Sequence, residues 1–170
     1  DLNAYTTKEE TWISASFLER DLERAIELVS DISFNSTFPD KEIAKEQEVI
    51  LDEIASVLDN PSDVIFDEFE ERLFGTHPLG RTILGTQESV NNLGKLQINS
   101  FVDRYYCPDQ MVFASVGSTP IADLKKLCEK YLSHEIGRVS KLNRRVPKAI
   151  PVFDERVEQD THQVHHLLGG

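Results

Sequence analysis

The chain has 170 residues, of which 39% are hydrophobic and 28% charged, and 30 acidic against 18 basic side chains give a net charge of −12. This length suits one domain or little more, and the regular recurrence of apolar residues excludes a disordered chain. No stretch approaches the roughly 18 apolar residues of a membrane span, and an acidic surface repels nucleic acid and anionic lipid. We therefore expect neither a nucleic-acid partner nor a membrane partner.

The cysteine content and the two ends of the chain bear on location and completeness. Cys107 and Cys128 are too few for a disulfide framework and favour a reducing compartment. A cytoplasmic location is therefore favoured, with the bacterial periplasm as the alternative. The chain begins at Asp1 and ends in VHHLLGG, which is typical of a strand just begun. We expect a fragment of a longer protein.

The first predicted elements are a strand and a helix. Residues 3–17 are rich in Thr, Tyr, Trp and Ile, and Ile13, Ala15 and Phe17 alternate with polar neighbours, which predicts a strand with one buried face. Its polar first half, NAYTTKEET, predicts an exposed edge that is either protected or free to bind an extended peptide. Apolar residues at helical spacing then predict a helix over 18–34.

Helices dominate the rest of the chain up to residue 134. Asp40 is expected to cap a long helix running to residue 60, and Pro61 to open a helix that ends at Gly75. The segment THPLGRTILGT, residues 76–86, is expected to be a loop. Shorter helices are predicted over 87–92, 95–106 and 119–134, and MVFASV, residues 111–116, predicts a buried strand.

This order of elements indicates an α/β or α+β layer, with helices covering one face of a sheet. Residues 135–151 carry five basic side chains and two prolines, which predicts a linker. A basic nucleic-acid arm is disfavoured there because no aromatic residues are interleaved. We assign residues 1–134 to a first α+β unit, residues 135–151 to a linker, and residues 152–170 to the first strand region of a second α+β unit.

The helix over 40–60 carries the sharpest chemical signal. Its apolar residues form one stripe, made of Ile43, Ile50, Leu51, Ile54, Val57 and Leu58. Glu46 and Glu53 lie at the border of this stripe, two turns or about 10 Å apart. A partly desolvated carboxylate at such a border suits a metal ligand or an acid/base group. Border glutamates more commonly point to water, so the pattern alone leaves both interpretations open.

The histidines do not predict a second metal site. In a strand, His162 and His166 would share one face about 13 Å apart, and His165 would face the other way. His77 is expected to stabilise its loop, and His134 to end a helix, where a cation suits the helix dipole.

Four segments together point to a family: NAYTTKEET, KEQEVILDEI, DNPSDVIFDEFEERLFGTHPLGRTILGT and YYCPDQMVFASVG, in this order over nearly the whole chain. The sequence resembles the pitrilysin/insulinase family of zinc peptidases, and within it the bacterial members that are similar to mitochondrial processing peptidase. The resemblance implies an α+β fold, a mixed β-sheet covered by helices, as a partial metallopeptidase half-domain. It also implies a peptide substrate and either a homodimer or pairing with a related subunit or second domain.

The resemblance also implies the roles of particular residues. The family uses an inverted zinc motif, His-x-x-Glu-His, and a third ligand from a glutamate on a later helix, which Glu53 matches. Glu46 matches the accompanying glutamate that supports the zinc ligands. Such a set leaves zinc a position for water, which zinc acidifies, and a further glutamate acts as general base. Asn3, Ala4 and Tyr5 match the family's N-A-x-T segment, whose edge strand is implied to take up the substrate as an added strand.

The sequence departs from the family in one respect, because His-x-x-Glu-His does not occur in the 170 residues. In the family this motif lies roughly seventy residues before the third ligand, which falls before residue 1 here. We therefore expect a fragment of a zinc-dependent metalloendopeptidase that hydrolyses peptides or unfolded polypeptides. The fragment itself should hold no zinc and be inactive, because two histidines and the general base lie upstream.

Two alternatives compete with this prediction. The first is a non-catalytic partner or structural subunit of the same fold, which binds peptide or a catalytic partner without zinc. The presence of both Glu46 and Glu53 argues against it, because a subunit without metal needs neither. The second is a helical interaction module, in which these glutamates only face water.

Overall fold

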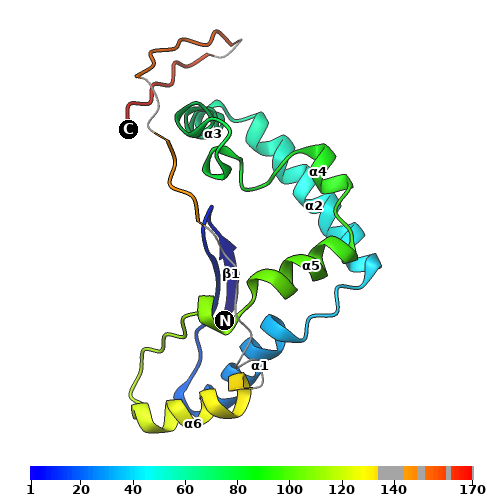
Figure 1. The fold of residues 1–170 in the computed structure, drawn as a ribbon, viewed down its shortest axis with the longest axis vertical. Coiled ribbons are helices and arrows are strands. Elements are labelled where there is room, and N and C mark those ends of the chain that lie inside the picture. The colour runs from blue at the N-terminus through cyan, green and yellow to red at the C-terminus, as the bar shows by residue number, and fades with distance from the viewer. Residues whose placement is uncertain (134–143, 149–151, 160–161, 170) are drawn as a thin grey trace. The chain divides into compact units, whose positions relative to one another are not determined.

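The computed structural model describes residues 1–133, 144–148, 152–159 and 162–169 (Figure 1). The chain divides into two compact units, one formed by Asp1–Asp40 with Gly94–Asn143 and the other by Lys41–Leu93 with Arg144–Gly170. The predicted α+β class is confirmed: helices predominate, and the described residues contain one two-stranded sheet. The predicted division at residues 134 and 151 stays a prediction.

The first unit opens with a β-hairpin. β1 (Leu2–Thr6) pairs antiparallel with β2 (Thr11–Ala15). The single strand predicted over 3–17 is thus corrected to two strands, because the Thr7 hydroxyl accepts the backbone N–H groups of Glu9 and Glu10 and reverses the chain there. Alternation along β2 is confirmed for its half-buried residues, whereas Phe17, predicted on the same face, is 44% exposed.

The described residues of the first unit also form three helices and two short 3-10 turns: η1 (Glu19–Asp21), α1 (Leu22–Phe34), α5 (Lys95–Tyr105), η3 (Pro108–Gln110) and α6 (Ile121–Leu132). α1 and α6, blue and yellow in Figure 1, pack against each other. The buried Ser30 hydroxyl donates to the Tyr131 carbonyl at 2.6 Å. Glu23 accepts from Lys130 Nζ at 2.7 Å and from the Tyr131 hydroxyl at 3.0 Å, which adds a polar clasp to the same pair of helices.

The clasp between α1 and α6 should make the stability of this unit depend on pH. The hydrogen bond from Lys130, and then that from Tyr131, lowers the pKa of Glu23 from its ordinary value of 4.5. The hydrogen bond to Glu23 in turn raises the pKa of Lys130 above its ordinary value of 10.5. The contribution of Glu23 is therefore present above the unfolded pKa and lost as pH falls through the lower folded pKa. That of Lys130 is present below the unfolded pKa and lost as pH rises through the higher folded pKa.

We accordingly expect Glu23→Gln to lower the urea midpoint of unfolding at neutral pH and to have a progressively smaller effect as the pH falls through the lowered pKa of the folded carboxyl. Glu27→Gln, an exposed glutamate one turn further along α1, is the matched control. A loss of stability by Glu23→Gln that stays the same from pH 3 to pH 7 would contradict the ionic origin of the clasp.

The second unit is built from helices: α2 (Asp40–Leu58), α3 (Pro61–Phe74), the 3-10 turn η2 (Pro78–Gly80) and α4 (Gln87–Asn91). The boundaries of α3 confirm the prediction. The Asn60 side chain accepts from the Ser62 N–H, Pro61 is the first helical residue, and Gly75 follows the helix with φ +54°. Asp40 is the first residue of α2 rather than the predicted cap before it.

The segment 76–86 is a loop, as predicted, apart from the short turn η2. His77 Nδ1 accepts the Leu79 N–H at 3.3 Å, and His77 Nε2 lies 3.0 Å from the Arg145 carbonyl oxygen. The prediction that His77 stabilises its loop is therefore confirmed. Gly80 is required here, because a Cβ at this position would approach the Gly75 carbonyl oxygen to 2.9 Å.

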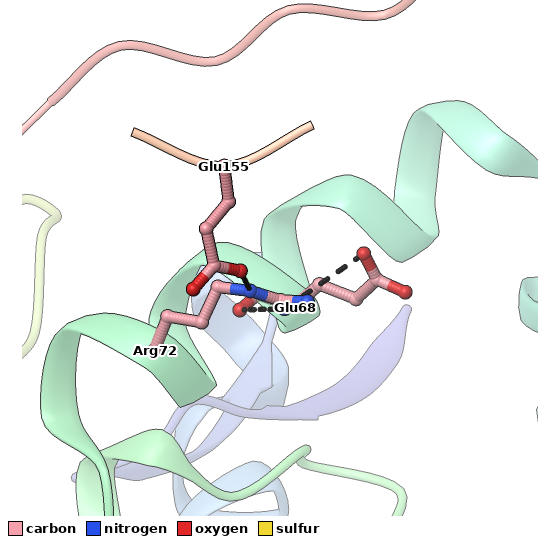
Figure 2. A network of polar contacts seen from close by, with 3 residues as sticks. All are labelled: Glu68, Arg72 and Glu155. Carbon is pink, nitrogen blue, oxygen red and sulfur yellow. Dashed lines mark hydrogen bonds and ion pairs between the residues drawn. The ribbon is translucent and has the colours of Figure 1, made fainter. Parts of the chain in front are cut away.

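The segment 152–159 is held against α3 by one charged contact and one aromatic contact. The Arg72 guanidinium donates to the Glu155 carboxylate and to the Glu68 carbonyl, and Figure 2 shows Arg72 between these two partners. The bond with Glu155 raises the pKa of Arg72. Phe153 packs on Phe69 with ring centroids 5.6 Å apart. These side-chain contacts hold the segment on α3, although the segment forms no strand.

Two predicted strands are wrong for the described residues. Residues 111–116 form no strand and are all exposed, with Val112 at 93% and Val116 at 103%. Residues 152–159 and 162–169 likewise contain no strand. Both segments have the composition of a strand, but a strand also needs a neighbour to share its backbone hydrogen bonds, and no other described strand pairs with either.

Cys107 is buried and Cys128 half-buried, and both are free thiols, as predicted. Burial, with a smaller effect from Glu129, raises the pKa of Cys128. Within the described parts of the chain, no helix combines the length and the apolar character needed to cross a bilayer. His134 and most of the predicted linker lie outside the described residues.

Candidate functional site

α2 carries both predicted metal-site carboxylates on one side. Seven residues bring a helix back to within about 20° of the same direction, so Glu46 and Glu53 share a face roughly 10 Å apart along the axis. Both side chains are exposed, whereas the adjacent Ile54 is 7% exposed. The predicted apolar stripe is confirmed by the half-buried or buried residues Ile43, Ile50, Leu51, Ile54 and Val57. Leu58, at 62% exposed, does not belong to it.

The two carboxylates remain available to a ligand. Among the described residues, neither Glu46 nor Glu53 makes a hydrogen bond or an ion pair. Glu42, one turn before Glu46 on α2, is by contrast paired with Lys45 at 2.9 Å. Free carboxylate oxygens are suitable ligands for zinc, which takes four donors, commonly a mixture of His, Cys and carboxylate.

A complete ligand set is not present in the described part of the chain. No group of three or more His, Cys, Asp or Glu side chains there could hold a metal ion. His162, His165 and His166 lie in a segment without regular structure. Glu46 and Glu53 therefore fit zinc only as part of a ligand set, and the described residues do not supply its other members.

Gln47 fixes the turn of α2 that bears Glu46. Its side-chain amide donates to the Val90 carbonyl at 2.8 Å and to the Leu93 carbonyl at 3.0 Å. The Val90 oxygen lies in the last turn of α4 and also accepts the Leu93 N–H at 3.1 Å, whereas the Leu93 oxygen lies two residues beyond the helix. Sequence reasoning missed this residue, although there was a signal: at 100° per residue Gln47 falls inside the apolar stripe, where a polar side chain needs a buried partner.

We expect Gln47→Ala to destabilise the second unit by about 1–3 kcal/mol, because it removes two hydrogen bonds that join α2 to the end of α4, each worth about 0.5–1.5 kcal/mol. Urea unfolding followed by far-UV circular dichroism would measure the change. Lys45→Ala, two positions away and exposed, is the control and should change the free energy of unfolding by less than about 0.5 kcal/mol. Equal effects of the two substitutions would show that the Gln47 amide does not hold α4.

The register of the hairpin determines which backbone groups of β1 face outward. Asp1 and Ser16 exchange both backbone hydrogen bonds, at 2.7 and 2.8 Å, and the Thr7 N–H donates to the Glu10 carbonyl at 2.8 Å. Hydrogen-bonded and non-hydrogen-bonded pairs alternate along an antiparallel ladder. Odd-numbered residues of β1 therefore turn their N–H and C=O groups toward β2, and even-numbered residues turn them to the free edge.

Ala4 thus presents its backbone groups at the free edge of β1, where the described residues contain no further strand. Its N–H is not open, however, because it donates to Asn3 Oδ1 at 2.9 Å. A peptide that pairs with Ala4 can accept this N–H only after the Asn3 side chain moves. Asn3 therefore protects the edge in the unliganded chain, as sheet edges generally require.

Tyr5 is stacked across the hairpin on Trp12, with ring centroids 5.7 Å apart and planes 8° from parallel. The Trp12 Nε1–H donates to Glu10 Oε2 at 3.0 Å, which fixes the indole. The structure thus brings Asn3, Ala4 and Tyr5 together on β1, and Glu46 and Glu53 together on α2. The two sets belong to different compact units.

Two family models match most of the chain. Residues 1–87 match the family model described as Insulinase (Peptidase family M16), and residues 92–168 match that of the Peptidase M16 inactive domain. This chain belongs to the insulinase family. The family resemblance carried by the sequence motifs is thereby confirmed.

Individual relatives agree with this assignment. An uncharacterized zinc protease of Mycobacterium leprae is 36% identical over 99% of this chain and 39% of its own length. The mitochondrial-processing peptidase subunit beta of Neurospora crassa is 31% identical over 94% of this chain and 34% of its own length. A crystal structure of a peptidase M16 inactive domain from Pseudomonas fluorescens has a TM-score of 0.76 at 20% identity, covering 87% of this chain and 36% of that one. That likeness shows the fold, and the chain spans about two fifths or less of these relatives.

Proposed function

We propose that this chain is part of a zinc-dependent endopeptidase that hydrolyses peptides or unfolded polypeptides. One observation carries the proposal: in a family whose members include zinc proteases, α2 holds two exposed carboxylates on one face without partners among the described residues. Unpaired glutamates at this spacing suit a ligand set that is completed from elsewhere in a longer protein.

In this proposal Glu53 is a zinc ligand and Glu46 supports the other ligands by accepting hydrogen bonds from them. Zinc, when bound, supplies a Lewis acid that polarises a peptide carbonyl and acidifies water. Asn3, Ala4 and Tyr5 on β1 bind the peptide as an added strand, through the outward-facing backbone groups of Ala4. Recognition through the backbone suits a peptidase of broad sequence specificity.

The proposal extends to assembly and location. We infer that the whole protein works as a homodimer or pairs with a related subunit or second domain, and the Neurospora crassa relative is itself named a subunit. We further propose a cytoplasmic location, supported by two free cysteines, with the bacterial periplasm as the alternative.

A comparison of the 170-residue chain with the longer protein that carries it tests the proposal. We expect the chain by itself to contain no stoichiometric zinc and to cleave no internally quenched peptide. The longer protein should contain one zinc per active site and cleave the peptide. One zinc per molecule in the 170-residue chain would contradict the inactivity of the fragment, and a longer protein without zinc would contradict the peptidase proposal.

A second candidate function is a non-catalytic subunit of the same fold that binds peptide or a catalytic partner. The match of residues 92–168 to the Peptidase M16 inactive domain favours it. A longer protein that binds peptide without zinc and without cleavage would support this candidate in place of the first.

A further inference from the structure

We propose that the stacked pair Tyr5–Trp12 selects an aromatic side chain of the bound peptide. The inference rests on the proposed function, in which β1 takes up a peptide as an added strand. It concerns which peptide sequences the site prefers. The outward-facing backbone groups of Ala4 do not determine this preference, because backbone pairing is the same for every sequence.

The pair is a preformed aromatic surface. Tyr5 and Trp12 are 51% and 47% exposed, although they cover each other on one side. The hydrogen bond from Trp12 Nε1 to Glu10 fixes one ring, and the nearly parallel stacking orients the other. Because one face of the Tyr5 ring is turned toward Trp12 on β2, its opposite face is turned away from β2, toward the free edge of β1.

An added strand would bring a side chain to this open face. Paired strands lie about 4.8 Å apart, and alternate side chains of each point to the same side of the sheet. The peptide residue opposite Tyr5 would therefore extend a row that already contains Trp12 and Tyr5. A third ring in this row continues the stack at a spacing close to the 5.7 Å between the first two.

The surroundings of the open face favour an uncharged ring over a cation. The residues two positions to either side of Tyr5 on the same face of the hairpin are Asn3 and Thr7, both neutral. The Glu10 carboxylate lies on the opposite strand and is bonded to Trp12. The guanidinium of an Arg residue would thus face a Tyr ring, which attracts cations more weakly than a Trp ring does, and would find no carboxylate beside it. An aliphatic side chain would gain contact area but no stacking.

Trp12 is the only tryptophan of the chain, so its fluorescence reports on this site alone. The probes are tryptophan-free, capped heptapeptides of Gly, Ser and Thr that differ only in a central Phe, Leu, Ala or Arg. We expect the Phe peptide to change the Trp12 fluorescence and to bind about three- to tenfold more tightly than the Leu peptide. Dye-labelled peptides should lose this preference with Tyr5→Leu and keep it with Tyr5→Phe, which retains the ring and the fold of the hairpin.

The outcomes separate this inference from the proposed function. Every second amide of an added strand faces β1, so of two Phe peptides N-methylated on the two alternate sets of amides, one cannot pair with β1. Undiminished binding by both peptides would contradict strand addition itself. Binding that depends on these amides, but is equal for Phe and Leu, would overturn the aromatic selection and leave strand addition in place. Tightest binding by the Arg peptide would overturn it as well, in favour of a cation site.

Discussion

In the longer zinc peptidase proposed above, replacing Glu53 by Gln is expected to abolish stoichiometric zinc binding and to reduce peptidase activity by more than about a hundredfold. This exceeds the roughly 10–100-fold loss typical of residues that only support a metal ligand. The neutral amide keeps the size of the side chain but removes the charge that holds the metal. Because Glu53 is exposed, the free energy of unfolding should change by less than about 0.5 kcal/mol in the absence of metal.

Two further glutamates of α2 make this experiment specific. Glu46→Gln should weaken zinc binding by about 10–100-fold and reduce activity without abolishing it, as expected for a supporting group. Glu48 points about 140–160° away from Glu53 and Glu46 around the helix, so Glu48→Gln should alter neither property. Zinc content and cleavage rate of the three variants give the comparison, and a Glu53→Gln protein with unchanged zinc content would refute the ligand assignment.

The largest effect on stability is expected from Ile54→Ala, which should lower the free energy of unfolding by about 2–4 kcal/mol. Ile54 is the buried residue of α2, at 7% exposed, and the substitution removes apolar contacts and leaves a cavity. Urea unfolding followed by far-UV circular dichroism measures the loss, since the second unit is helical.

Leu58→Ala is the matched control for this substitution. Leu58 lies one turn further along α2 and is 62% exposed, so its truncation should cost less than about 0.5 kcal/mol. If both variants lost the same stability, the loss would come from helix propensity or from the unfolded state rather than from burial. Such a result would contradict the placement of Ile54 in the core of the second unit.

The boundaries of the helices could be predicted because the signals are local. Asn60, Pro61 and Gly75 act within one turn of the helix end that they define, and the same holds for the apolar spacing of α2. The two glutamates of the candidate site could be placed on one face of α2 for the same reason, since helical geometry fixes the direction of every side chain.

The strands could not be predicted in the same way. Residues 111–116 have the composition of a buried strand but are exposed and unpaired among the described residues, because pairing depends on a neighbour that composition does not specify. The hairpin at the N-terminus shows the reverse case. There the Thr7 hydroxyl reverses the chain and brings β1 and β2 together, so a segment predicted as one strand becomes two.

The sequence by itself determined the family and the helices, because motifs and helical spacing are properties of neighbouring residues, and the residues that it assigns to metal and peptide stay predictions. Only the tertiary structure decided how those residues are supported. It placed the Gln47 amide on carbonyls more than forty positions away, turned Ala4 outward, and stacked Tyr5 on Trp12. Each of these contacts joins residues on different helices or strands, and their partners are fixed by packing and register rather than by local spacing.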